Sequence, residues 1–150
     1  MKEGAFGAAR YHMKQIREDF IAPCGMNCRL CIGFQRDKNK CLGCRYEDAI
    51  LYVTKESRHC VIKSCQKKSD KGYCFECESY PCRRLKDLDK RYRTKYHMSM
   101  LENLEYIRQQ GIDSFIDAEE QRWTCPTCQQ ILCVHRPNCL TCKTKIFDSK

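Results

Sequence analysis

Apolar residues recur at three- and four-residue steps just after the middle of the chain, where most of the intervening positions are charged. Leu85, Leu88, Tyr92 and Tyr96 fall on one face of a helical wheel. This pattern predicts an amphipathic helix over about residues 80–95, with its apolar face turned to a core.

A second helix is predicted to begin at Ser99. The Ser99 hydroxyl can accept one unpaired backbone amide, and Glu102 can reach back to another, as in a capping box. Leu104 and Ile107 continue the apolar face of this helix. Gly111 is suited to end it, because glycine adopts a left-handed conformation at low cost.

Three weaker patterns predict further helices. Phe115 and Ile116 indicate a short third helix, and Trp123 follows it as a large residue able to close the core. Near-helical spacing also predicts a helix over residues 8–19, and a shorter one over residues 46–53.

Cysteine dominates the composition, with 15 residues in a chain of 150. The number is odd, and no secretory signal is visible at the N-terminus, so a disulfide scaffold is not expected. The pattern favours a reduced, cytoplasmic protein whose thiolates hold metal. No run of 18 apolar residues is present, so a membrane is not expected as a partner.

The cysteines fall into two groups separated by a long gap. Ten lie in the first part of the chain and five near its end. We therefore expect three regions, namely a Cys-rich metal-binding region over residues 1–82, a helical connector over 83–122 and a zinc-ribbon-like module over 123–150. The expected fold class is α+β, a small irregular fold stapled by metal.

The last cysteines give the most specific signal. Two Cys-x-x-Cys turns face each other across ten residues and supply four thiolates, Cys125, Cys128, Cys139 and Cys142. Four thiolates suit a tetrahedral zinc site, in a zinc ribbon or in the similar rubredoxin-like knuckles. Residues 130–135 are a plausible hairpin strand. Cys133 is interpreted as a small buried residue, and His135 as a hydrogen-bonded or surface histidine rather than a ligand.

The first ten cysteines are also candidate metal ligands, but their spacing does not determine how they pair. They are Cys24, Cys28, Cys31, Cys41, Cys44, Cys60, Cys65, Cys74, Cys77 and Cys82. In one interpretation, zinc sites staple a region too poor in hydrocarbon to fold alone. In the other, Cys24, Cys28 and Cys31 hold a [4Fe-4S] cluster with a distant partner such as Cys82, which lies beside a proline.

The ordered set of Cys motifs resembles an uncharacterised Cys-rich domain-of-unknown-function family of bacteria and archaea. The resemblance is carried by PCGMNCRLC at 23–31, CLGC at 41–44, CVIKSC at 60–65, CFECESYPC at 74–82, ENLEYI at 102–107, GI at 111–112 and the C-terminal turns. It implies a shared fold that binds metal, with zinc as the expected ion, and it implies no reaction.

Basic residues give the chain a formal charge of +9 and concentrate in residues 83–95, with Tyr92 and Tyr96 among them. Such a helix can contact nucleic acid phosphates. Three zinc sites with four thiolates each would, however, lower the formal charge from +9 to about +3. Nucleic acid is therefore a less favoured partner, and a protein partner of unknown identity is compatible with the sequence.

The sequence favours a multi-site zinc-binding protein in the cytoplasm, with two to three Zn²⁺ per chain and a mainly structural use of metal. It would act as a binding or regulatory module. An enzyme is not favoured, because no phosphate-binding loop, dinucleotide motif or His-Glu-x-x-His is present. An iron–sulfur protein of electron transfer is the first alternative, and a zinc-ribbon nucleic-acid binder is the second.

Overall fold

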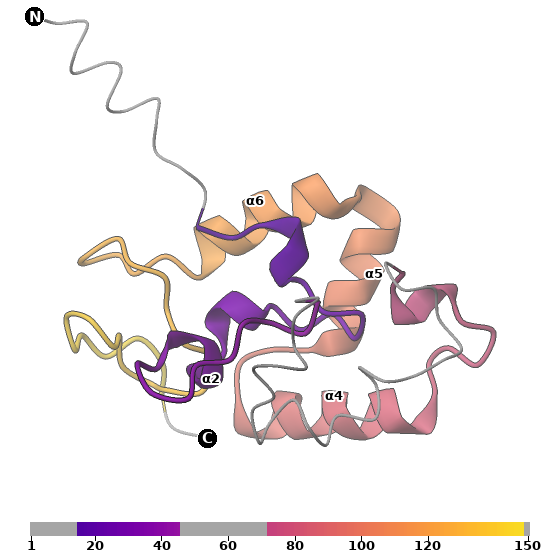
Figure 1. Ribbon diagram of the computed structural model, residues 1–150, viewed down its shortest axis with the longest axis horizontal. Helices are drawn as coiled ribbons and strands as arrows, with labels where there is room; N and C mark the ends of the chain where they lie inside the picture. Colours follow the sequence, from indigo (N-terminus) through magenta and orange to yellow (C-terminus); the bar gives the residue numbers. More distant parts are fainter. Residues whose placement is uncertain (1–14, 46–71, 149–150) are drawn as a thin grey trace, which may run out of the picture.

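The computed structural model describes residues 15–45 and 72–148 (Figure 1). In chain order the elements are η1 (Glu18–Phe20), η2 (Cys28–Leu30), α2 (Ile32–Gln35), η4 (Cys74–Glu76), α4 (Arg83–Lys95), α5 (Met100–Gln110) and α6 (Ile112–Arg122). Pairing of the β type is limited, in these residues, to three isolated bridges. The described fold is thus mostly helical, with little strand.

Helix α4 confirms the helix predicted from the apolar stripe, but it begins at Arg83 and not at residue 80. Tyr80 instead closes the preceding turn, where its amide donates to the carbonyl of Cys77. Leu85 and Tyr92 are buried on one side of α4, while its basic residues are exposed. Tyr92 and Tyr96 therefore pack inward and do not interleave with the basic face.

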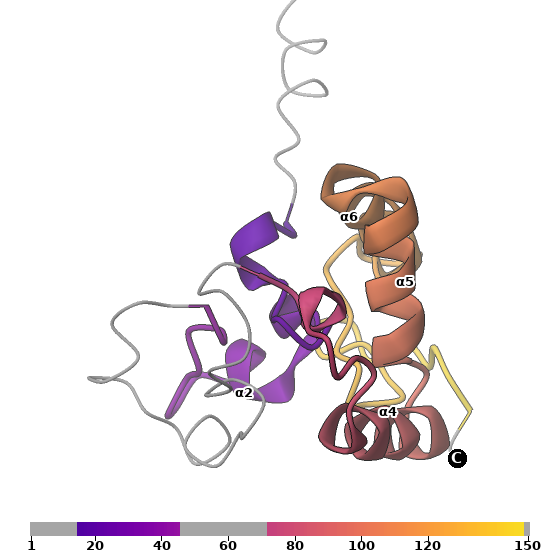
Figure 2. The same ribbon diagram turned by 90° about the vertical axis from the view of Figure 1, so that its right-hand side faces the viewer.

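Helix α5 starts where the sequence predicts. The Ser99 hydroxyl accepts the amide of Glu102 at 3.1 Å, so the first half of the capping box is confirmed. Gly111 has φ +88° and ψ 162°, a conformation that is essentially restricted to glycine. It ends α5 and also caps the start of α6, so one residue joins the two helices. Figure 2 shows α4, α5 and α6 together on one side of the molecule and α2 on the other.

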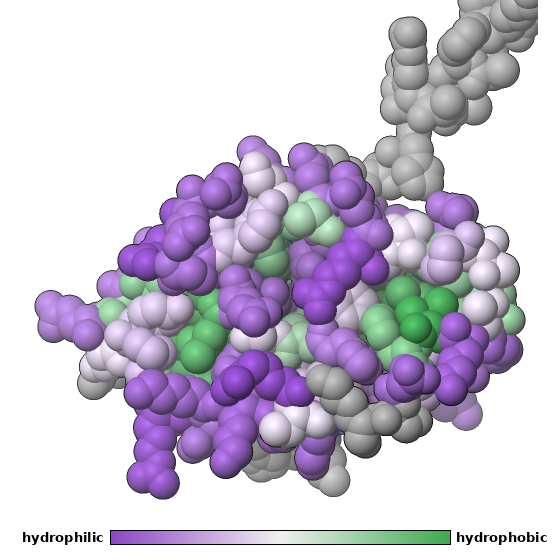
Figure 3. Space-filling model, turned by 180° about the vertical axis from the view of Figure 1, so that it is seen from behind, coloured by the Kyte–Doolittle hydropathy of each residue, from purple (hydrophilic) through white to green (hydrophobic). Residues whose placement is uncertain are grey.

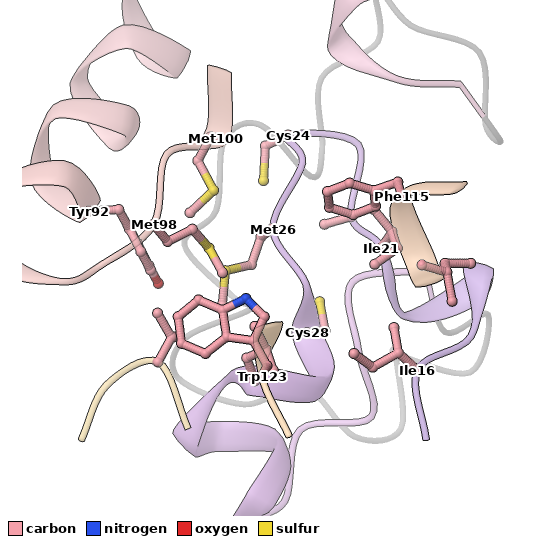
Figure 4. Packing of buried hydrophobic residues seen from close by; sticks show 14 of the residues in the cluster. Ile16, Ile21, Cys24, Met26, Cys28, Tyr92, Met98, Met100, Phe115 and Trp123 are labelled. Carbon is pink, nitrogen blue, oxygen red and sulfur yellow. The ribbon is translucent and has the colours of Figure 1, made fainter. Parts of the chain in front are cut away.

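Residues from all three predicted regions build one hydrophobic core. Ile21 and Leu30 contribute from the first region, Leu85 and Leu104 from the helices, and Trp123 from the start of the last region. Methionines fill much of the space between these parts, and Figure 4 shows Met26 and Met98 beside the Trp123 ring. The unbranched methionine side chain fits such irregular gaps.

Three sequence predictions differ from the structure or fall outside it. The predicted strand over residues 130–135 is wrong, since only a bridge between Thr124 and Ile131 forms there. Instead of pairing as a strand, this segment forms hydrogen bonds with α2 and with residues next to α2. The predicted helix over 8–19 lies mostly outside the described residues, and its end is a 3-10 turn at η1. The predicted helix over 46–53 lies wholly outside them.

The surface is largely hydrophilic on the face drawn in Figure 3, with apolar side chains in small separate patches. Among the described residues, Tyr106 is the large hydrophobic side chain that is exposed. None of the helices in this part of the chain combines the length and apolar character needed to cross a membrane.

Candidate metal centre

Four thiols converge near the C-terminus as the sequence predicts. The sulfurs of Cys125, Cys128, Cys139 and Cys142 all lie within 4.8 Å of one another. Cys125 Sγ is 3.7 Å from Cys142 Sγ, and Cys128 Sγ is 3.6 Å from Cys139 Sγ. Four sulfurs about 2.3 Å from a central ion would be about 3.8 Å apart at the corners of a tetrahedron. The thiols are therefore spaced for one four-coordinate ion.

The first turn of this centre is built around Cys125. Its amide donates to the carbonyl of Gln130 (2.8 Å), and its carbonyl accepts the amide of Gln129 (3.0 Å). Gln129 has φ +65°, which is uncommon for a residue with a side chain. This tight turn brings the Cys128 sulfur round to face the Cys139 sulfur.

The second turn repeats the geometry of the first. The Cys139 amide donates to the carbonyl of Thr144 (2.9 Å), and the Cys139 carbonyl accepts the amide of Lys143 (3.0 Å). Lys143 has φ +68° and occupies the same place in its turn as Gln129 does in the first. The two Cys-x-x-Cys segments thus form matched turns that present their sulfurs to a common point.

Hydrogen bonds to sulfur prepare the cluster for the thiolate form. The Thr144 side chain lies 3.1 Å from Cys142 Sγ, and together with the Thr144 amide it lowers the pKa of Cys142 to about 6. The pKa of Cys125 is also lowered, mainly by the amides of Cys128 and Thr127. Metal binding needs deprotonated sulfur, so these contacts favour binding at neutral pH.

Cys128 behaves differently from these two thiols. The amide of Gln130 acts to lower its pKa, but burial and the neighbouring thiols outweigh that effect and raise the pKa to about 11. A cation at the centre of the four sulfurs would displace the remaining protons.

The end of α6 anchors the first turn in the core. Trp123 is fully buried directly after α6, and its indole N–H donates to Glu119 Oε2 at 3.1 Å. Its carbonyl accepts the amide of Leu132 at 2.7 Å. Burial raises the pKa of Glu119, which also accepts a hydrogen bond from Asn27. Contacts between segments far apart in sequence therefore fix the place where the first turn begins, at Thr124 and Cys125.

The N-terminal cysteines do not form a comparable set in the described residues, where the four C-terminal thiols are the group close enough to hold an ion. Cys28 instead pairs with Cys44, whose amide donates to Cys28 Sγ at 3.4 Å. The Cys44 thiol and burial raise the pKa of Cys28, and they outweigh this amide, which acts to lower it. Cys31 lies near Cys41. Cys60 and Cys65 lie outside the described residues, and Cys74, Cys77 and Cys82 are partly buried near η4 and the start of α4.

Both ring nitrogens of His135 have hydrogen-bond partners, as the sequence interpretation expects. Nδ1 accepts the amide of Ile32 at 3.2 Å, so the neutral ring carries its proton on Nε2. Nε2 lies 2.9 Å from the Tyr92 hydroxyl. Burial, followed by the charges of Arg136 and Arg91, lowers the pKa of His135 to about 4.

Sequence reasoning missed the groups that support the metal centre. Thr144 lies two residues after Cys142, and this spacing could have indicated a hydroxyl group that faces the Cys142 sulfur. Glu119 and Asn27 carried no such signal, because they are 92 positions apart and meet only in the fold.

Residues 20–87 match the model of a family described as a protein of unknown function (DUF3795). The matched segment contains the ten N-terminal cysteines and ends within α4, so the C-terminal centre lies beyond it. A comparison with curated proteins found no match. A comparison with solved structures found none either.

Proposed function

We propose that this is a multi-site zinc-binding protein of the reducing cytoplasm, whose metal is mainly structural and which acts as a binding or regulatory module. The observation that supports this most directly is the four-thiol centre, with sulfurs 3.6 and 3.7 Å apart in facing pairs. The C-terminal segment would then be a zinc-ribbon-like module. Both turns belong to the same core as the helices, so a bound ion would stabilise the whole fold.

A single iron ion would suit four thiolates as well as zinc does. A [4Fe-4S] cluster would need space for a cube of iron and sulfide between the thiolates, and the facing sulfur pairs are spaced for one ion. The C-terminal thiols are therefore better spaced for a single ion than for a cluster. The proposal takes that ion to be zinc and keeps iron as the alternative.

Elemental analysis of the full chain, purified without oxygen, tests the proposal. We expect two to three zinc ions per chain, and one fewer in Cys142→Ser. Lys143→Ser is the matched control, because it alters the same turn without removing a thiol, and it should retain the full zinc content. A brown protein containing iron and sulfide would contradict the proposal, as would a folded protein that binds no metal.

One observation favours nucleic-acid binding as a second function. The basic residues of α4 are all exposed along one helix, namely Arg83, Arg84, Lys86, Lys90, Arg91, Arg93 and Lys95. Two of these positive charges are paired with carboxylates of the same helix. Arg83 lies 3.9 Å from Asp87, and Arg93 lies 2.6 Å from Asp89. The helix would contact phosphates through charge alone, because Tyr92 is buried and cannot stack on a base.

A gel-shift titration at two salt concentrations tests this second function. Charge reversal at Arg84, Lys90 and Arg91 should weaken binding and reduce its dependence on salt. Charge reversal at Lys38 and Lys40, on a different part of the surface, is the control. No shift at low salt would rule the second function out.

A further inference from the structure

The segment around α2 and the segment before the last Cys turn are joined side by side. Three hydrogen bonds connect them: the Val134 amide to the Leu30 carbonyl (2.9 Å), the Ile32 amide to His135 Nδ1 (3.2 Å), and the Gln35 side chain to the Leu132 carbonyl (2.9 Å). Cys31 lies between two bonded residues of the first segment, and Cys133 lies between two of the second. The fold therefore brings Cys31 and Cys133, 102 positions apart, to the same junction.

Cys133 shares a local feature with the thiols of the C-terminal centre. Burial raises the pKa of Cys133, while the backbone amides two and three residues further along, those of His135 and Arg136, act to lower it. Amides at the same two steps lower the pKa of Cys125. The amides of Gly33 and Phe34 act in the same direction on Cys31, where burial outweighs them and raises the pKa. Such amides stabilise a thiolate, and a buried cysteine used only for packing does not need them.

Cys41 approaches this junction through Gly33. The Cys41 amide donates to the Gly33 carbonyl at 2.7 Å. A Cβ atom at position 33 would lie 3.5 Å from Cys31 Sγ and 3.5 Å from the Cys41 Cβ, so the two cysteines flank the glycine. Cys31 is also close enough to Cys41 and Cys133 to interact with the charge of each.

The other cysteines of the two N-terminal turns, Cys28 and Cys44, have their thiol neighbours away from this junction. Cys28 contacts Cys44 and interacts with Cys24, while Cys31 has Cys41 and Cys133 as its thiol neighbours. The two N-terminal Cys-x-x-Cys turns thus direct their sulfurs to two places, whereas the C-terminal turns direct all four to one.

From this geometry we propose that Cys31, Cys41 and Cys133 hold a further zinc ion, which ties the α2 segment to the C-terminal module. Cys133 is thereby a ligand, in contrast to the packing role inferred from the sequence. The three sulfurs do not all lie within 4.8 Å of one another. Binding of one ion therefore requires their side chains to rotate towards each other. This site rests on the proposed zinc-binding function and adds a separate ion to it.

Cadmium-substituted full-length protein provides the direct test, because the β protons of a ligating cysteine couple to the ¹¹³Cd nucleus. In a proton–cadmium correlation spectrum, Cys31, Cys41 and Cys133 should share one cadmium resonance, distinct from that of Cys125 and Cys142. A spectrum in which Cys133 couples to no cadmium, or to a different ion from Cys31, overturns the inference. This measurement uses the unmutated chain and does not depend on the folding of a variant.

Metal content of variants gives an independent readout. Cys133→Ala, which fits a small buried position, should lose one zinc per chain, and Cys31→Ala combined with it should lose no more. Cys142→Ser combined with Cys133→Ala should lose two. A folded Cys133→Ala protein with unreduced zinc content contradicts the junction site alone, whereas loss of all metal binding in the unmutated chain would contradict the proposed function itself.

Discussion

Gly25 shows how one missing side chain allows α5 to approach the N-terminal segment. Its φ is +89°, and a Cβ there would lie 2.8 Å from the Met100 carbonyl oxygen and 3.0 Å from Leu104. The side chain of Asn103 donates to the Gly25 carbonyl at 2.9 Å. Position 25 thus combines a conformation that favours glycine with direct contact between two backbones.

We predict that Gly25→Ala destabilises the fold by about 2–4 kcal/mol, because strain at positive φ and overpacking against Met100 act together. Gly111→Ala is the matched control, since Gly111 has φ +88° but nothing within 4 Å of its Cβ position. It should lose only the strain, about 1–2 kcal/mol. Urea unfolding of the metal-loaded proteins measures both, and equal losses would show that the contact with Met100 does not matter.

At the scale of elements, Asp89 joins α4 to the start of α5. It is fully buried, and its Oδ1 accepts the Ser99 hydroxyl at 2.6 Å and the Leu101 amide at 3.0 Å. Its Oδ2 accepts Arg93 Nε at 2.6 Å. Burial acts to raise the pKa of Asp89, but these hydrogen bonds outweigh it and hold the pKa below its usual value. A side chain of one helix therefore caps the next.

Asp89→Asn should cost about 2 kcal/mol of unfolding free energy, because an amide cannot accept all three donors and leaves a buried group unpaired. Asp87→Asn changes an exposed carboxylate on the same helix, 72% accessible, and should be nearly neutral. Urea midpoints of the two variants check this. A small loss in Asp89→Asn would mean that α5 does not depend on this cap.

Periodicity predicted the helices well, because Leu85, Tyr92 and Leu104 repeat at helical steps that depend only on local sequence. The four C-terminal thiols were predictable for the same reason, since each turn is local and the two turns share one motif. Asp89 was not identified, because its role depends on Ser99 and Leu101 of the next helix. Cys133 is fully buried, as the sequence interpretation expects. Its position beside the α2 segment could not be predicted, because the two segments are far apart in sequence.

At the scale of the whole molecule, His135 lies where three distant parts meet. It accepts the Ile32 amide, faces the Tyr92 hydroxyl of α4 and packs edge-on against Tyr96, with ring centroids 4.8 Å apart. The nearby charges of Arg91 and Arg136 disfavour the imidazolium. Protonation would place a proton on Nδ1, facing the Ile32 amide, and would break the junction.

The His135 pKa of about 4 in the fold lies below the unfolded value of about 6.5. The stability it contributes is therefore present above pH 6.5 and is lost as the pH falls from 6.5 towards 4. Between pH 7.5 and 5.5, the unmutated protein should lose about 1 kcal/mol more than His135→Gln. Both proteins carry the same thiols, so pH effects on metal binding cancel in the comparison. Equal losses would show that His135 does not control the pH dependence.

Trp123 connects the metal centre to the common core and provides a spectroscopic probe of both. It is the single tryptophan of the chain, it is fully buried, and it directly precedes Thr124 and Cys125. Its ring lies 5.5 Å from that of Phe147, which follows the second Cys turn. Residues that adjoin both turns therefore border the indole, and loss of the ion that holds the turns together should admit water to it.

Treatment of the protein with a strong zinc chelator should shift Trp123 emission to longer wavelength, in step with loss of one zinc per chain. Re-addition of zinc should reverse the shift. Cys142→Ser, which lacks a complete C-terminal centre, should begin with the shifted emission and respond little to chelator. If zinc leaves while the emission stays unchanged, then Trp123 remains packed without the ion, and hydrophobic contacts alone hold the C-terminal segment on the helices.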